Sequence, residues 1–188
     1  MPELRLRTGV MIGGESRRMG APKQLIEWRG RPLVAPIVDV LSMIRRPLFL
    51  GGGPLPDSLA AEERLADAPD HVGPVAGLIA ALRHDAVPWI VCACDMPLIS
   101  EAALEWLVRA RRPDTHAVLP VASGRVQPLF ALYEPTALPL LERLPESDPS
   151  PRRLVRFAGV VTPDVPDTLE RAWRNVNRPE DLAEIDRI

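Results

Sequence analysis

The sequence predicts an α/β domain with a mostly parallel sheet covered by helices. Short apolar runs bounded by glycine, proline and aspartate alternate with longer stretches of helical spacing, the pattern of parallel strands joined by helical crossovers. The length of 188 residues, with 46% hydrophobic and 26% charged residues, suits one globular domain with its own core. We therefore expect a single domain over residues 1–188.

The strands are expected where three to five mainly apolar residues lie between turn residues. The clearest is Trp89 to Ala93, a continuous apolar run that is typical of a strand buried on both faces. The full set, in chain order, is Gly9 to Ile12, Leu48 to Leu50, Trp89 to Ala93, Ala117 to Val121, Leu129 to Tyr133 and Val160 to Thr162.

The helices are expected where apolar residues recur three or four positions apart. Ser100 followed by Glu101 is a helix-capping pair, and Pro179 suits the first turn of the last helix. Residues 51–73 form a long connection, in which we expect a short helix near Ser58 to Leu65 and part of a site. The full set is Leu33 to Ile44, Val75 to Arg83, Glu101 to Arg111, Thr136 to Leu144, Arg152 to Ala158 and Pro179 to Ile188.

Composition argues against several classes of partner. The 23 basic and 25 acidic side chains give a net charge of −2, so we expect neither a nucleic-acid nor a membrane partner. Cys92 and Cys94 are the only cysteines, which indicates a reduced, cytoplasmic protein, and two thiols are too few for a structural zinc site. Apolar runs stay well below the roughly 20 residues that span a bilayer.

A glycine-rich loop with cations follows the first expected strand. Gly13 and Gly14 let backbone N–H groups approach an anion closely, while Arg18 and Lys23 supply positive charge suited to phosphate oxygens. The loop lacks the Gly-Lys-Ser/Thr of a Walker A motif and the glycine spacing of a dinucleotide fingerprint. Lys23 is the only lysine among the 23 basic residues. The alternative is an exposed turn with solvated arginines; the full spacing favours a phosphate loop.

Asp95 stands where the strand Trp89 to Ala93 ends. The carboxyl edge of parallel strands is where α/β sheets place ligands, and Mg²⁺ is usually held by one or two carboxylates with phosphates and water. We therefore interpret Asp95 as a metal carboxylate. The alternative, a cap of the following helix, fits Ser100 better.

Taken together, these motifs resemble the molybdenum cofactor guanylyltransferase family of NTP transferases. The resemblance rests on Gly-Gly-x-Ser-x-x-Met-Gly-x-x-Lys after the first strand and on three further segments, which in order and spacing cover nearly the whole chain. It implies a three-layer α/β/α sandwich with a Rossmann-like nucleotidyltransferase fold. The further segments are Gly73 to Leu78, Cys92 to Pro97 and Asn175 to Leu182.

The resemblance also implies a reaction and a set of residues. GMP would pass from GTP to molybdenum-loaded molybdopterin with Mg²⁺ as cofactor, without a covalent enzyme intermediate; transient contact with molybdoenzymes or other cofactor-synthesis proteins would fit such a role. Lys23, Arg18 and Asp95 would be catalytic, with Asp95 on the metal. Asp67 matches the family's nucleoside aspartate better than Asp70. The nucleotide would be bound by Met11, Ile12, Gly13, Gly14, Lys23, Asp67, Gly73 and Asp95.

The acceptor side is expected at Gln127, Asn175 and Asn177. Gln127 opens a segment that resembles the family's strand beside the acceptor pocket. Asn175 and Asn177 lie two apart, so on an extended segment they face the same way. For Asn177, however, the spacing to Glu180 predicts first a helix N-cap.

One departure from the family keeps alternatives open. Some relatives place an asparagine just after the second strand, where this chain has Gly51, Gly52 and Gly53, so only backbone can contact a base there. Molybdopterin cytidylyltransferase is therefore the nearest alternative, followed by another small-molecule phosphate nucleotidyltransferase. A non-catalytic nucleotide-binding module is the alternative outside enzymes.

Overall fold

The computed structural model describes residues 5–13 and 21–187. Its centre is a seven-stranded sheet with the spatial order β11-β7-β10-β6-β1-β4-β5. Every pairing in this sheet is parallel except those of β10, which runs antiparallel to both β6 and β7. The predicted mostly parallel α/β sheet is confirmed. The seven strands are β1 (Arg7–Met11), β4 (Leu48–Leu50), β5 (Arg64–Leu65), β6 (Trp89–Ala93), β7 (Ala117–Val118), β10 (Ala131–Tyr133) and β11 (Val160–Val161).

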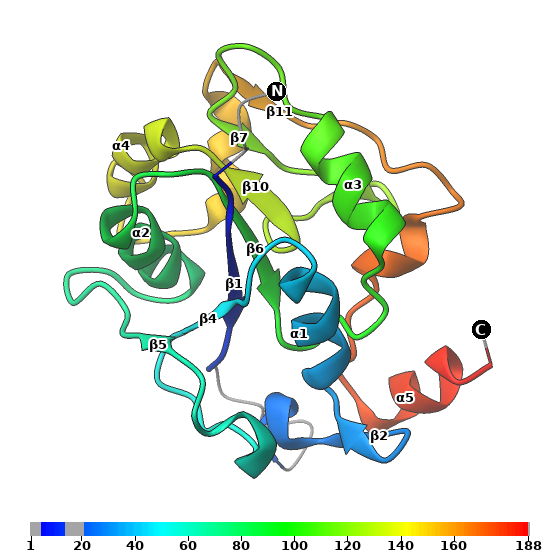
Figure 1. Cartoon of the computed structure of the whole chain (residues 1–188). Coiled ribbons are helices and arrows are strands. Elements are labelled where there is room, and N and C mark those ends of the chain that lie inside the picture. The colour runs from blue at the N-terminus through cyan, green and yellow to red at the C-terminus, as the bar shows by residue number, and fades with distance from the viewer. Residues whose placement is uncertain (1–4, 14–20, 188) are drawn as a thin grey trace.

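Helices cover both faces of the sheet, which makes three layers (Figure 1). On one face, α1 (Ala35–Ser42) and α3 (Glu101–Arg109) pack in one apolar cluster with alternate residues of β1 and β6. On the other face, α2 (Pro74–His84) and α4 (Leu138–Glu142) pack in a second cluster with the residues in between. This alternation follows from the two-residue period of a strand.

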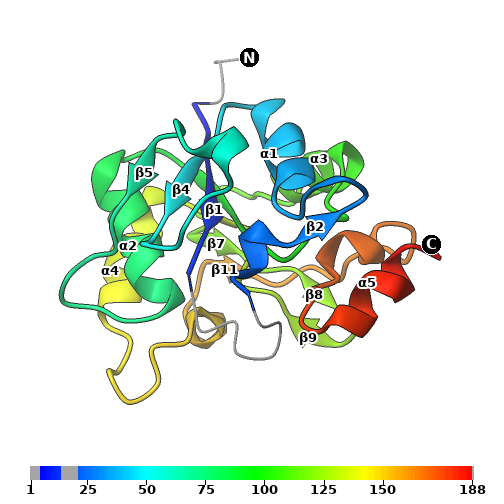
Figure 2. The ribbon, with the colours of Figure 1, turned by 90° about the horizontal axis from the view of Figure 1, so that it is seen from below.

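A smaller third cluster attaches the C-terminal helix α5 (Pro179–Ile185) to the hairpin of β2 (Glu27–Trp28) and β3 (Arg31–Pro32). Trp28 packs there with Val176 and Ile185, and its indole donates to Asp186 over 2.9 Å. The segment that leads into α5 is thereby held beside the carboxyl ends of the central strands (Figures 1 and 2).

Several expected elements differ from the structure, and proline or a turn accounts for most of the differences. The helix expected over Arg152 to Ala158 is a 3-10 helix, Pro151–Arg156, and the one expected over Thr136 to Leu144 starts as a 3-10 turn, Pro135–Ala137. The short helix near Ser58 to Leu65 is wrong: a 3-10 turn, Asp57–Leu59, precedes edge strand β5.

The strand expected over Ala117 to Val121 is also shorter than predicted. It stops at Val118, and after Pro120 the chain enters an unpredicted hairpin of β8 (Val121–Ala122) and β9 (Arg125–Val126). Ser123 and Gly124 turn this hairpin with φ of 49° and 67°, as a tight two-residue turn requires. In the part of the chain that the structure describes, no helix has the length and apolarity to cross a membrane.

Candidate active site

Most predicted site residues gather along one edge of the central sheet. Strands β1, β4, β5 and β6 run parallel, so the segments that follow them emerge at the same edge. Because β10 runs the other way, the segment that precedes it reaches this edge too. Along the edge the order is therefore Asp67 after β5, Gly51 after β4, Gly13 after β1, Asp95 after β6, and Gln127 ahead of β10.

The centre of this edge is an ion pair between Lys23 and Asp95. Lys23 Nζ lies 2.6 Å from Asp95 Oδ2, although the two residues are 72 positions apart in the sequence. Asp95 is 8% exposed, and the Lys23 side chain 19%. Lys23 opens a 3-10 turn, Lys23–Leu25, which follows directly on the phosphate loop. Lys23, which ends the loop motif, therefore meets the acidic strand end.

Both asparagines of the C-terminal segment reach the same ion pair. The backbone N–H of Val176 donates to the Asp95 carbonyl oxygen over 2.8 Å, so the segment lies directly on the end of β6. The Asn175 amide nitrogen is 3.4 Å from Asp95 Oδ1, and Asn177 Oδ1 accepts from Lys23 Nζ over 2.7 Å. The two side chains thus flank Lys23 and Asp95 from one segment.

The predicted N-cap role of Asn177 is wrong. The cap of α5 is Arg178, one residue later, and the carboxylate of Asp181 accepts from the backbone N–H groups of both Arg178 and Asn177, over 2.9 and 2.7 Å. Asp181 thus takes the N3 position of the capping box, which the sequence spacing gave to Glu180, and the Asn177 side chain contacts Lys23 instead. By contrast, Ser100 caps α3 as predicted, since its Oγ accepts from Ala103 N over 3.3 Å.

Glycines shape the edge beside β1. Gly13 has φ of 128°, a conformation that side-chain-bearing residues rarely adopt, and Gly73 caps the start of α2 with φ of 65°. A Cβ at Gly51 would lie 2.4 Å from the Ile12 carbonyl oxygen, so the chain after β4 touches the end of β1. Gly14 and Arg18, which the sequence assigns to the phosphate loop, lie outside the described residues.

Asp67, rather than Asp70, lies against these glycines, although both residues are exposed. A Cβ at Gly77 would lie 3.3 Å from Asp67 Oδ1 and 2.8 Å from the sulfur of Met11, and one at Gly51 would lie 3.5 Å from Asp67 Oδ2. The carboxylate therefore lies next to the positions where side chains at Gly51 and Gly77 would begin. Partial burial here raises the pKa of Asp67, because removal of water disfavours the charged form.

This raised pKa predicts a pH-dependent stability difference for Asp67→Asn. The pKa of Asp67 is higher in the folded state than in the unfolded state, so the folded state binds this proton more tightly. The free energy of unfolding of the wild type therefore falls as the pH rises from the unfolded-state pKa through the folded-state pKa. We expect Asp67→Asn to have the higher Tm at neutral pH and to lose that advantage as the medium becomes acidic. Thermal unfolding of both proteins between pH 4 and pH 8 measures it; equal Tm values at neutral pH would contradict it.

A pocket of about 420 Å³ lies on the side of β10, and Asp95 is not among its lining residues. Its lining residues come mainly from the β8–β9 hairpin and from a 3-10 turn, Glu170–Trp173. Gln127 lines it, and so does Arg174, the residue before Asn175. Its size is that of a small-molecule site. The other lining residues are Ala122, Ser123, Asp167, Glu170, Arg171 and Trp173.

Hydrogen bonds and a ring contact hold the elements that line this pocket in place. Glu170 accepts from the Ser123 backbone N–H and hydroxyl, which fastens the hairpin tip. Phe130 adopts φ of 54°, and its carbonyl accepts from the Trp173 indole over 2.9 Å while the two rings stack 4.7 Å apart. The sequence analysis missed Glu170 and Arg171, because no motif marks the turn that carries them.

Gln24 was missed as well, although it is among the most buried polar residues described. It is 2% exposed, and its amide nitrogen donates to the Pro54 carbonyl oxygen over 2.9 Å. A single glutamine between Lys23 and Leu25 carries no periodicity or motif, so its contacts could not be inferred from the sequence.

The two cysteines pack in the core, as predicted. Burial raises the pKa of Cys94 to about 12 and that of Cys92 well above its ordinary value, with the nearby Asp95 carboxylate as a further cause in both. Both thiols therefore stay protonated at neutral pH.

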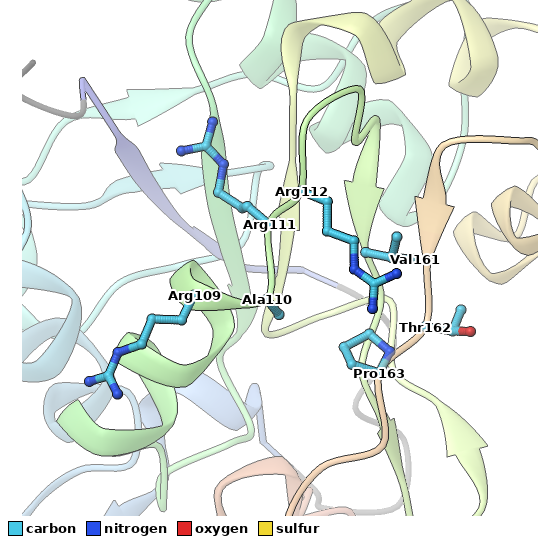
Figure 3. A pocket seen from close by; sticks show the side chains of 7 residues that line it. All are labelled: Arg109, Ala110, Arg111, Arg112, Val161, Thr162 and Pro163. Carbon is cyan, nitrogen blue, oxygen red and sulfur yellow. The ribbon is translucent and has the colours of Figure 1, made fainter.

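A second pocket of about 420 Å³ lies away from the active-site edge, between the end of α3 and β11 (Figure 3). Because α3 starts after Asp95 and runs back along the sheet, its last residues reach the opposite edge. Figure 3 shows Arg112 extending toward Val161 and Pro163. Arg109 and Arg111 line this pocket too, but Glu105 and Glu134 pair with them. It contains none of the predicted site residues.

Comparison with known proteins finds similar sequences over most of the chain. The family model described as "MobA-like NTP transferase domain" matches residues 9–165. A probable molybdenum cofactor guanylyltransferase from Bacillus licheniformis is 32% identical in an alignment of 186 residues that covers 94% of each chain. A molybdenum cofactor biosynthesis bifunctional protein from Synechocystis is 31% identical over 94% of this chain; the chain spans about half the length of that relative, 52%.

A solved structure shows the same architecture. The crystal structure of molybdopterin-guanine dinucleotide biosynthesis protein A from Archaeoglobus fulgidus superposes with a TM-score of 0.79 at 26% identity, over 96% of this chain and 97% of that one. The similarity thus extends beyond the segment that the family model matches.

Proposed function

Because the chain belongs to the MobA-like NTP transferase family, with molybdenum cofactor guanylyltransferases among its relatives, we propose that it transfers GMP from GTP to molybdenum-loaded molybdopterin. In this reaction an oxygen of the acceptor's phosphate bonds to the α-phosphorus of GTP. The bond between that phosphorus and the oxygen bridging to the β-phosphate breaks, and pyrophosphate leaves. The observation that carries the proposal is the 2.6 Å contact between Lys23, at the end of the phosphate loop, and Asp95.

The order of residues along the sheet edge suggests where each substrate binds. Asp67, the glycines after β4 and Gly73 form the side toward β5, which suits the nucleoside of GTP. Gln127 and Asn175 lie at or beside the pocket on the side of β10, which suits the acceptor. Lys23 and Asp95 lie between the two sides, where the phosphates of both substrates have to meet. Catalysis would then depend on positioning and on stabilisation of charge.

Asp95 is the residue that would hold Mg²⁺. The ion accepts oxygen ligands and needs only one or two protein carboxylates when phosphates and water complete its shell. Asp95 Oδ1 and Oδ2 lie just beyond the carboxyl end of β6, with Asn175 and Lys23 as their partners, so these oxygen donors fit such an ion. Bound Mg²⁺ would neutralise charge on the phosphates. Lys23 would contribute a positive charge to the triphosphate, and Asn175 would orient the carboxylate.

We also propose that the whole chain, residues 1–188, acts as one domain. Asn175 and Asn177 follow the segment matched by the family model, yet their side chains contact Asp95 and Lys23. A site assembled from both ends of the sequence supports a single catalytic unit.

The proposal is tested by incubating the protein with GTP, Mg²⁺ and verified molybdenum-loaded molybdopterin. We expect release of pyrophosphate and formation of the guanine dinucleotide. A parallel reaction with CTP serves as control, since product from CTP alone would transfer the assignment to the cytidylyl relatives. If neither nucleotide reacts, sugar and alcohol phosphates replace the acceptor. Absence of pyrophosphate with every acceptor would contradict the transferase function and favour the alternative of a non-catalytic nucleotide-binding module.

The acceptor pocket makes a separate prediction for Arg171. This side chain is exposed at the pocket, and the described residues provide no ion-pair partner for it, so it is available to an anionic acceptor. We expect Arg171→Met to raise the KM for the acceptor by about 3- to 10-fold, the effect of one charge-assisted contact, with the KM for GTP unchanged. Steady-state kinetics with each substrate varied in turn measure this.

The matched control is Arg112→Met, which removes an exposed arginine from the pocket at the opposite edge. It should change neither KM. Equal acceptor KM values for Arg171→Met and the wild type would exclude this contact.

A further inference from the structure

The glycine loop after β4, Gly51 to Pro54, rests on one buried side chain. Gln24 lies beneath it and donates from Nε2 to the Pro54 carbonyl oxygen. The Cys94 thiol, 3.7 Å from Gln24 Oε1, donates to the other end of the amide. With a donor on one side and a carbonyl on the other, the amide has a single favourable orientation.

The approach of the loop to Gln24 is close enough to require glycine. A Cβ at Gly53 would lie 2.7 Å from Gln24 Nε2, 2.9 Å from Gly13 N and 3.2 Å from the Ile12 carbonyl carbon. Arg64 Nη1 donates to the Gly53 carbonyl oxygen over 3.2 Å from the other side. The loop is therefore held against the end of β1 by two side chains that donate to its carbonyl groups.

The three glycines of the loop have no side chains that could contact the base of a nucleotide. Gly51, Gly52 and Gly53 present only backbone groups, and Gly52 is exposed with open space where its Cβ would be. Backbone N–H and C=O groups discriminate between nucleotide bases only if their positions are fixed. In a fixed backbone, a base with the wrong pattern of donors and acceptors leaves polar groups unpaired, which costs binding free energy. A loop of glycines has little stiffness of its own.

We propose that Gln24 is a positioning residue that fixes the Gly51 to Pro54 backbone relative to Gly13 and Lys23, and thereby sets the preference of the enzyme for the base of its nucleotide. The inference rests on the proposed function. Gln24 connects three parts of the site: its neighbour Lys23, the glycine loop, and Cys94, which precedes Asp95. Loss of this amide should therefore weaken binding of the nucleoside by the glycine loop more than it slows the reaction at Asp95.

The test compares Gln24→Met, which keeps the length of the side chain but lacks the amide, with Thr8→Val. Thr8 is also buried, and its hydroxyl donates to the Arg45 carbonyl oxygen over 2.6 Å at the opposite edge of the sheet. Both variants thus lose one buried hydrogen bond from a side chain to a backbone carbonyl. Thr8→Val should lower the Tm and leave the kinetic constants and the preference among GTP, ATP, CTP and UTP unchanged.

For Gln24→Met we expect the KM for the preferred nucleotide to rise about 3- to 10-fold and its advantage over the other three to fall by a similar factor, with kcat at saturation changed less. A variant that loses Tm but keeps KM and base preference, as Thr8→Val should, would overturn the proposal. If Gln24→Met does not fold, Arg64→Met removes the other bond to the loop from an exposed position; an unchanged base preference there would equally overturn it.

The two proposals fail in different ways. Product from CTP but not from GTP in the wild type would refute the guanylyl assignment, while the comparison of Gln24→Met with the wild type would still test the role of the loop with the nucleotide that is used. If the wild type turns over no nucleotide, the wild type and Gln24→Met are compared by the thermal shift that each of the same four nucleotides produces. There, identical nucleotide-induced shifts for wild type and Gln24→Met would overturn the positioning role.

Discussion

Replacement of Asp95 by asparagine is expected to lower kcat by at least about 10³-fold while the protein stays folded. The carboxylate is the proposed metal ligand and the partner of Lys23, and metal-ion stabilisation of phosphate charge contributes several kcal/mol, at about 1.4 kcal/mol for each factor of ten in rate. Asparagine keeps the shape of the side chain and its contact with Asn175. Pyrophosphate release with both substrates at saturation measures the loss, and circular dichroism checks the fold.

Asp85→Asn is the matched control for this variant. Asp85 accepts from Arg7 over 2.8 Å in a half-buried ion pair at the amino end of β1, on the edge of the sheet opposite the site. Its replacement removes the same chemical group and should leave kcat unchanged. Activity of Asp95→Asn within tenfold of the wild type would remove the central role of Asp95 from the proposed function.

Replacement of Lys23 by methionine is expected to lower kcat by about 10²- to 10³-fold, the effect of one preorganised charge on a transition state. The Lys23 ammonium lies between Asp95 Oδ2 and Asn177 Oδ1, so it is fixed where the proposed triphosphate would carry its charge. Methionine retains the unbranched, flexible shape and removes only the cation. Single-turnover measurements with excess enzyme separate the loss in chemistry from a loss in GTP binding.

Arg7→Met provides the corresponding control, because Arg7 is 20% exposed in its ion pair and Lys23 is 19% exposed. This variant should reduce stability slightly and leave turnover unchanged. A Lys23→Met enzyme with full activity would instead favour a binding module in which the ion pair has only a structural role.

The central strands could be predicted because their signal is local. Trp89 to Ala93 and Leu48 to Leu50 are continuous apolar runs, and both strands have the predicted bounds. Edge elements gave no such signal. Strand β5 contains only Arg64 and Leu65, and its pairing to Phe49 and Leu50 depends on a neighbour rather than on its own pattern. The β8–β9 hairpin was missed for the same reason, because strands of two residues are too short to show a period.

The sequence by itself determined which residue types form the candidate site: a glycine loop that ends in the only lysine, an aspartate at a strand end, and two asparagines near the C-terminus. These signals depend on residue types and short spacings, which need no knowledge of distant contacts. Only the tertiary structure decided what each group touches. In the structure, the side chain of Asn177 contacts Lys23 and does not cap the helix. Asp67 rather than Asp70 lies against Gly51 and Gly77, and Gln24 lies beneath the glycine loop. Such contacts join segments tens of residues apart, and their geometry follows from the order of strands in the sheet and from packing at its carboxyl edge, which no local pattern encodes.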